Sequence, residues 1–512
     1  MLLLNQPPLG TQRTMPLSFN LKDEKFTTWA LFGLTLLFGI VYWHLYSESV
    51  PALHIFGKYM GFGHINYFSE EYFDFLADKP NGYPAFLFLV KLFSPNKVIF
   101  VNVVILFQLS AFLLSVWYLS VRFYYFSNSR LLSLLLLLLI LGNPEIIKFC
   151  FLVMTESFMM TLLVLILALS CQWTIRTKIA TQHRPLTLIS LCLGASILLR
   201  PICYAWIIAA ILVLAVFYGR SQFTWPDRLK IIKVFAIPML LCWMLGASFH
   251  YAKFGSFKKT ELLDALLLTK VALSLEQQDV QSPSPFIKNL LDLHKPVHEL
   301  MRHAQTTQMK YWIALSYQDG TRLSLPLFNK LYMDVDKQSK QAFIDMCIHH
   351  PVKYLKNIAM HYLALWQFWE LMTPEDVHVF TQFSATYGLP FIGPIEDLTP
   401  IYTSRLNLNS YTTSPSFLLF IRTMMGIIWM VTLYFFVYSI QCLLNRKPIT
   451  APVWTGLIAA TMIQVTYLIT ASVNVGAFRY AIVMWPAIIF VGVTFLLLFR
   501  KLFDHPRNLS LS

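Results

Sequence analysis

Long apolar stretches separated by short polar connections are the dominant pattern of this chain. An apolar stretch of about 18 or more residues can cross the hydrocarbon core of a bilayer as a helix. The pattern therefore predicts an all-α polytopic membrane protein with about ten transmembrane helices, within a range of roughly 8 to 12. The predicted spans are 27–46, 97–121, 131–143, 150–172, 186–199, 201–219, 231–249, 416–440, 451–472 and 480–499.

The fifth and sixth of these spans are short, and only Arg200 and Pro201 separate them. Proline disfavours the continuation of a helix, so the sequence favours a break at this point. A single kinked element over both spans is the alternative.

One long interruption divides the apolar pattern. Residues 249–415 carry 15 basic and 15 acidic side chains. Loops of this length are usually folded and functional, so we expect a mainly helical, soluble extracytoplasmic domain with helices near 285–303 and 339–370. The predicted organisation is a transmembrane module at 1–248 with a catalytic first external loop at 47–96, the extracytoplasmic domain at 249–415, and C-terminal transmembrane helices at 416–512.

The distribution of charge predicts how the chain is oriented in the membrane. The chain is 56% hydrophobic and 13% charged, with a formal net charge of +14. If the N-terminus is cytoplasmic, the cytoplasmic segments hold 17 basic and 4 acidic residues, and the rest of the chain holds 23 and 22. This is the positive-inside pattern. We therefore expect both termini in the cytoplasm, taken to be that of a bacterium with the chain in its inner membrane, and no nucleic-acid partner.

Candidate chemistry begins in the first external loop. Glu48 follows the first span, where a carboxylate is partly removed from water and becomes more basic, as a general base requires. Lys79 opens the turn Lys79-Pro80-Asn81-Gly82-Tyr83-Pro84, which two prolines and a glycine make rigid. A lysine held at the membrane boundary suits a phosphate group. The structural alternatives are a charge that ends a helix and a lysine that snorkels to the headgroups.

Three further charged positions fall at the same predicted membrane face. Glu156 lies near the start of the fourth span, Arg200 follows the fifth, and Arg479-Tyr480 opens the tenth. An acid within a span usually faces the bundle interior or a water-filled cavity, and two arginines beside a lysine can hold a phosphate or pyrophosphate. Hydrogen bonding inside the bundle and contacts with lipid headgroups are the structural alternatives.

Taken together, these motifs resemble those of the membrane-embedded GT-C glycosyltransferases. The closest groups are the protein O-mannosyltransferases and the 4-amino-4-deoxy-L-arabinose lipid A transferases. The resemblance rests on the order of five motifs over most of the chain: Glu48, the turn at 79–84, Met154-Thr155-Glu156, Leu199-Arg200-Pro201, and Arg479-Tyr480 ahead of Pro486.

The resemblance implies a GT-C fold and a cell-envelope enzyme that moves a lipid-linked sugar. The sugar would pass, with inversion, from a polyprenyl-phosphate donor to a lipid, polysaccharide or protein acceptor outside the cytoplasm. Glu48 would be the catalytic base, where the family usually has Asp. Glu156 would be a second catalytic acid, sometimes linked to a divalent metal, which is the one cofactor implied. The donor-binding residues would be Lys79, Tyr83, Arg200, Arg479 and Tyr480.

Two other functions fit an apolar chain of this kind. A transporter or flippase of a lipid-linked sugar would carry acids near mid-membrane and inverted repeats, whereas the acids here gather at one predicted face. A non-catalytic assembly protein that keeps the GT-C fold is the other alternative.

Overall fold

Helices make up the secondary structure of the part of the chain that the computed structural model describes, and no strand occurs there. The described residues are 21–47, 82–175, 179–220, 225–254, 262–280, 285–323, 335–369, 371–387, 414–445, 449–473 and 478–504. The predicted all-α fold class is therefore confirmed for these residues.

The N-terminal half contains nine α-helices and one short 3-10 helix within the described residues. They are α1 (Leu21–Ser47), α3 (Gly82–Leu92), α4 (Lys97–Ser127), α5 (Arg130–Leu141), α6 (Pro144–Cys150), α7 (Glu156–Ile175), α8 (Ile179–Leu199), η3 (Pro201–Cys203), α9 (Tyr204–Arg220) and α10 (Trp225–Phe254).

The remaining described helices follow in two groups. The first group is α11 (Leu262–Ser274), η4 (Gln277–Asp279), α12 (Pro285–His303), α13 (Thr307–Leu323), α15 (Val335–His349), α16 (Pro351–Gln367) and α17 (Pro374–Thr386). The second group is α20 (Pro415–Leu444), α21 (Ala451–Val473), α22 (Phe478–Val483) and α23 (Trp485–Asp504).

Six of the described helices are long and apolar enough to cross a membrane: α1, α4, α7, α10, α20 and α21. A seventh span is added if α5 and α6, which meet at a 60° bend, count as one. The other three predicted spans correspond to shorter apolar helices, His183–Leu199, Pro201–Val216 and Trp485–Arg500. The chain is thus a helical membrane protein, and the count of ten spans stays a prediction.

Two boundaries differ from the predicted ones. The fourth predicted span starts at 150, but α7 begins at Glu156, because Asn143 caps a separate short helix, α6, that ends at Cys150. The helix expected over 339–370 is two helices, because Pro351 begins α16 as a new helix. The break expected at Arg200 is present, with extended backbone at φ −153° and ψ 141°.

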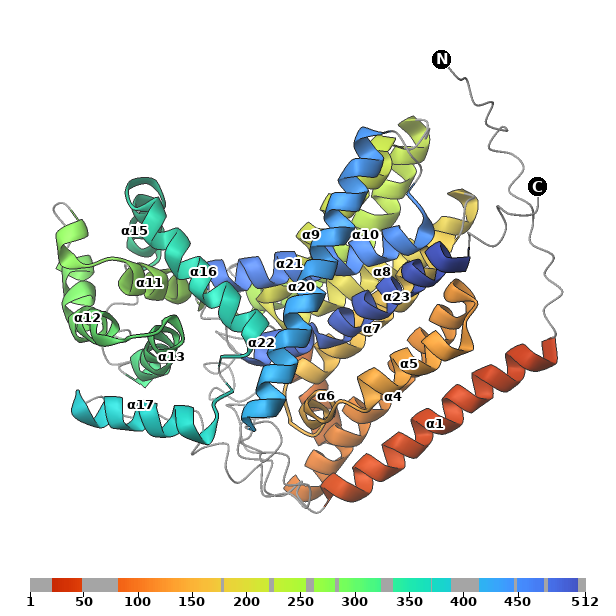
Figure 1. The fold of residues 1–512 in the computed structure, drawn as a ribbon, viewed down its shortest axis with the longest axis horizontal. Coiled ribbons are helices and arrows are strands. Elements are labelled where there is room, and N and C mark those ends of the chain that lie inside the picture. Colours follow the sequence, from red (N-terminus) through yellow and green to blue (C-terminus); the bar gives the residue numbers. More distant parts are fainter. Residues whose placement is uncertain are drawn as a thin grey trace.

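The apolar helices pack into one bundle. In Figure 1, α4, α5, α7 and α23 run with a similar tilt, and α1 lies along their edge. α21 is the most central of them, since it contacts α7, α9, α16, α20 and α23. At one end of the bundle, Nη1 of Arg500 donates to Oγ of Ser129 at 3.1 Å. This contact brings together two parts of the chain that the charge pattern assigns to the cytoplasmic side.

Helices α11, α12, α13, α15 and α17 lie together at one side of the bundle (Figure 1). Two small cores hold them, one around Trp312 and Phe380 and one around Leu268 and Met346. α16 joins this group to the bundle: Met360 and Ala364 belong to the core around Trp312, whereas Leu365, Trp366 and Phe368 belong to the bundle core.

Candidate active site

A buried ion pair joins two helix ends of the bundle. Oε1 of Glu156 lies 2.8 Å from Nη2 of Arg200, in the orientation of an ion pair rather than of a linear hydrogen bond. The Glu156 side chain is fully buried and the Arg200 side chain is 16% exposed. Oγ1 of Thr155 donates to the second carboxylate oxygen at 3.2 Å. Because a charge is costly to bury alone, each partner accounts for the burial of the other.

Local structure positions both partners. Glu156 is the first residue of α7, where the free N–H groups and the helix dipole favour a negative charge. Arg200 precedes Pro201, which keeps the residue before it out of the helical conformation. α8 therefore stops at Leu199, and the extended backbone of Arg200 allows its side chain to leave the helix axis.

Tyr480 completes the arginine's surroundings. Cζ of Arg200 lies 5.5 Å from the centroid of the Tyr480 ring, which is a cation–π contact. Tyr480 belongs to α22, which packs against α6 and α7. A guanidinium has five N–H donors, so an arginine that pairs through one nitrogen and rests on an aromatic face retains donors for an anion.

The start of α3 is held close to the same helix ends. A Cβ added to Gly82 would lie 2.7 Å from the carbonyl oxygen of Leu198, so only glycine permits this approach. Leu198 precedes Arg200 by two residues. The turn that the sequence singled out therefore ends directly beside the end of α8.

Tyr83 and Gln108 tie three segments together behind the ion pair. The hydroxyl of Tyr83, which is fully buried, donates to Oε1 of Gln108 at 2.7 Å. Nε2 of Gln108 donates to the carbonyl oxygens of Leu152 at 2.8 Å and Cys150 at 3.2 Å. These bonds connect α3, α4 and the turn that leads to Glu156. Tyr83 thus has a structural contact here, and its predicted contact with substrate stays a prediction.

The structure brings Tyr83, Glu156, Arg200 and Tyr480 to one end of the bundle, although they are distant in sequence. Glu48 and Lys79 lie outside the described residues, and so does the side chain of Arg479. The described residues that flank the first external loop are nearby. Tyr46 stacks on Phe151 with ring centroids 4.7 Å apart, and Gly82 touches Leu198.

Two features of this region were missed by the sequence analysis. Gln108 is a lone amide in an apolar helix, and a lone residue has no periodicity to reveal it. Glu145 and Lys148 of α6 form a second buried pair at 3.3 Å. An acid and a base three residues apart, directly after a proline, were a signal for a capped helical turn within an apolar region.

No group of three His, Cys, Asp or Glu side chains is placed to hold a metal within the described residues. Glu156 had been assigned a possible metal role, and Arg200 pairs with one of its two oxygens.

A different polar cluster lies in the outer helices. Nζ of Lys270 donates to Oδ1 of Asn357 at 2.8 Å, and the lysine is 1% exposed. His361, one turn after Asn357, is fully buried, and neither ring nitrogen has a hydrogen-bond partner among the described residues. Burial lowers the pKa of Lys270 well below 10.5. Burial, followed by the charge of Lys270, lowers the pKa of His361 well below 6.5.

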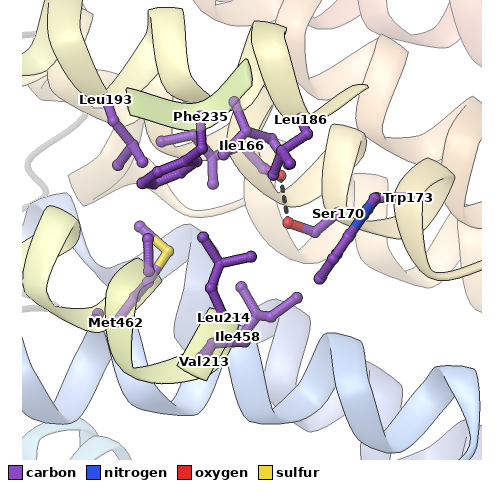
Figure 2. A pocket seen from close by; sticks show the side chains of 13 residues that line it. Ile166, Ser170, Trp173, Leu186, Leu193, Val213, Leu214, Phe235, Ile458 and Met462 are labelled. Carbon is purple, nitrogen blue, oxygen red and sulfur yellow. Dashed lines mark hydrogen bonds between the residues drawn. The ribbon is translucent and has the colours of Figure 1, made fainter. Parts of the chain in front are cut away.

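An apolar cavity of about 40 Å³ lies among α7, α8, α9, α10 and α21 (Figure 2). Its lining includes Ile166, Leu193, Phe235 and Met462, and the hydroxyl of Ser170 is bonded to the carbonyl oxygen of Ile166 in its own helix. Fourteen residues of α7, or about 21 Å of helix, separate Ser170 from Glu156. The cavity is therefore separate from the ion pair, and its lining is mostly apolar.

No protein-family model, curated protein or solved structure matches the chain.

Proposed function

We propose that the chain is a polyprenyl-phosphate-dependent glycosyltransferase of the GT-C type, with its site at the end of the bundle that carries Glu156 and Arg200. The donor would be a lipid-linked sugar, and the acceptor an extracytoplasmic lipid, polysaccharide or protein. The proposal includes ten spans, cytoplasmic termini and an outer domain at 249–415.

The observation that carries the proposal is the ion pair of Glu156 and Arg200 with Tyr480 beside it. A packing role alone would be met by apolar side chains at lower cost. Instead, the bundle keeps an arginine partly exposed at the edge of a hydrocarbon core. An amphiphile with a phosphate headgroup is the ligand that reaches such a place with its negative charge at the right depth.

The proposed reaction is a single displacement. An acceptor hydroxyl or amine attacks the anomeric carbon and loses its proton to Glu48. The bond from that carbon to the phosphate oxygen breaks, and the phosphate leaves with the electron pair. Lys79 and Arg200, with Arg479, would stabilise the charge that develops on the leaving group. One displacement inverts the anomeric centre. Two contacts support this assignment: Tyr46, two residues before Glu48, stacks on Phe151 in the turn before Glu156, and Gly82, three residues after Lys79, lies against Leu198.

The test is donor cleavage by the full chain in nanodiscs. The purified protein is given polyprenyl-phosphate sugars and a cell-envelope extract as acceptor source, and free polyprenyl phosphate is measured. Glu48→Gln, Lys79→Ala and Arg200→Lys are each expected to reduce the rate by about a hundredfold or more, the usual cost of removing one group that stabilises a transition state.

Arg302→Lys is the matched control, because Arg302 forms an ion pair with Glu276 on the surface of the outer helices. Full rates in Glu48→Gln and Lys79→Ala would show that the site is assigned wrongly. Movement of intact lipid-linked sugar across the bilayer, without cleavage, would establish the transporter alternative instead.

A further inference from the structure

α16 has an apolar face that no part of the described chain covers. Val352, Leu355, Ala359 and Leu363 follow one another at spacings of three and four residues, so they lie on one face of the helix. Val352 is 63% exposed, Leu355 is 60% exposed and Leu363 is 42% exposed. We call these four residues the outer stripe. Ile344 and Ile348, near the end of α15, are exposed as well.

The outer stripe is additional to the buried face of α16. Asn357, Met360, His361 and Ala364 are the residues that pack this helix against its neighbours. A helix of a water-soluble domain normally has polar residues opposite its buried face. α16 instead has apolar residues on two faces, and contiguous exposed apolar surface marks a contact with a partner or a membrane.

Contacts with α21 place α16 at the level of the bilayer. The hydroxyl of Tyr354 donates to the carbonyl oxygen of Ser472 at 3.1 Å, next to the end of the span Ala451–Val473. Two helical turns further along α16, the hydroxyl of Tyr362 donates to Oε1 of Gln464. Gln464 lies eight residues, or about 12 Å of helix, inward from Ser472. α16 therefore starts beside the end of α21 and stays in contact with it for two helical turns.

The outer stripe is continuous with the surface that faces lipid. Leu468 lies one turn from both Gln464 and Ser472 on α21, and it is 52% exposed. Leu355 and Leu363 each directly follow a tyrosine, Tyr354 or Tyr362, that contacts this face of α21. Apolar side chains on the two helices therefore border the same open surface at the depth of a transmembrane span.

Charges at the start of α16 fit the same position. Lys356 is exposed directly beside Leu355, and Lys353 is held by an ion pair to Asp279 at 2.5 Å. A lysine at this level can rest its methylene chain on apolar surface and direct its ammonium group to lipid phosphates.

From these observations we infer that α16 is a membrane-contacting helix whose outer stripe is embedded in the outer leaflet, with phospholipid acyl chains against Leu355 and Leu363 and headgroups around Lys356. The outer helices are then held on the bilayer by α16 as well as by their connections to the bundle. This inference is independent of the proposed glycosyl transfer, because it needs only the lipid.

The test measures the depth of a fluorophore in proteoliposomes. The full chain carries Cys347→Ser, since Cys347 is partly exposed on α15, and either Leu355→Cys or Lys288→Cys is labelled with an environment-sensitive dye. Lys288 is exposed on α12, and α12 lies among the outer helices at the side of the molecule away from the bundle (Figure 1). The labelled Cys347→Ser parent is the blank. Quenching by brominated phospholipids is compared with quenching by aqueous iodide.

The expected result is quenching at Leu355 by brominated phospholipid that is several-fold stronger than at Lys288, with the reverse order for iodide. Equal iodide quenching at both positions would overturn the inference, because the outer stripe would then face water. Protection of Leu355 from both quenchers would also overturn it, because another protein surface, such as a second copy of the chain, would then cover the stripe. Neither readout depends on catalytic activity.

Discussion

Two of the buried polar clusters in the described part of the chain meet the cost of burying charged groups in opposite ways. Glu156 and Arg200 are buried as opposite charges 2.8 Å apart. Lys270 and His361 are buried as two bases, and no carboxylate among the described residues forms an ion pair with Lys270. The first cluster keeps its charges by pairing them. The second avoids charge, because burial lowers the pKa of both groups and favours their neutral forms.

Under the proposed function, this difference separates a cluster that acts on a charged ligand from one that packs helices together. A permanent guanidinium at the edge of the bundle can bind an anion at any physiological pH. A buried amine with a lowered pKa contributes hydrogen bonds and shape, and it ties the stability of the outer helices to pH. Substitutions in each cluster test whether the two clusters differ in this way.

Arg200→Ala should have the largest effect. It leaves the fully buried carboxylate of Glu156 without its partner, which typically costs about 3–5 kcal/mol of unfolding free energy. The double variant Glu156→Leu/Arg200→Met removes both charges and should restore most of that loss, while donor cleavage stays abolished. Thermal unfolding in detergent and the cleavage assay check the two halves. Recovery of donor cleavage in the double variant would show that the ion pair is not needed for the reaction.

Gln108→Leu tests a neutral buried cluster and should rank second. It leaves the Tyr83 hydroxyl without the Gln108 acceptor, and the loss of a buried partner costs roughly 1–3 kcal/mol. The carbonyl oxygen of Leu152 keeps the N–H of Met154 as a donor. Tyr83→Phe removes only one of the three bonds and should cost about 1 kcal/mol. If both variants melt at the wild-type temperature, the connection of α3 to the turn before Glu156 is not important for stability.

Lys270→Met/Asn357→Leu should change the pH dependence of the outer helices. The folded-state pKa of Lys270 lies below its unfolded value of 10.5, so the unfolded chain binds the proton first as pH falls. Stability is then lost from pH 10.5 down to the folded pKa, by up to about 1.4 kcal/mol for each pH unit. His361 adds the same trend below pH 6.5.

The double variant should flatten the part of this slope that belongs to Lys270, and a smaller slope should remain for His361, since burial is the larger cause of its lowered pKa. Hydrogen exchange of α11 and α16 at several pH values measures it locally. Lys288→Met, at an exposed lysine of α12, should leave the slope unchanged. An unaltered slope in the double variant would show that Lys270 is not buried in its neutral form.

Arg302→Ala should have the smallest effect. The arginine side chain is 60% exposed in its ion pair with Glu276, and exposed pairs contribute about 0–1 kcal/mol. A shift in melting temperature as large as that of Arg200→Ala would show that the exposed and the buried ion pair contribute equally to stability.

Sequence patterning was sufficient for the helices and for part of the site. Apolar length located a helix at each of the ten predicted spans, and Pro201 predicted the break that frees Arg200. Topology alone placed Glu156, Arg200 and Tyr480 at one face, and the structure brings them into contact. The motif order could be seen because charged residues stand out against an apolar background.

The other buried groups leave weaker traces in the sequence. Gln108 and Lys270 sit in apolar helices, where one polar residue looks like a surface position or a tolerated exception. His361 lies in an amphipathic helix whose two apolar faces cannot be told apart by periodicity. Which face is buried depends on α11, α13 and α21, and those partners are fixed only by the tertiary fold. The roles of Glu48 and Lys79 stay predictions.

The end of α16 has a mechanical consequence. Consecutive residues there are divided between two cores, with Ala364 packed among the outer helices and Leu365 packed in the bundle. At Phe368 the backbone takes a left-handed conformation, φ 51°, and the ring packs on Trp485. A helix shared in this way cannot serve as a hinge, because rotating it would unpack both cores at once. A displacement of the outer helices is therefore transmitted through α16, which moves as a rigid unit, to the start of α23, a few residues from Tyr480.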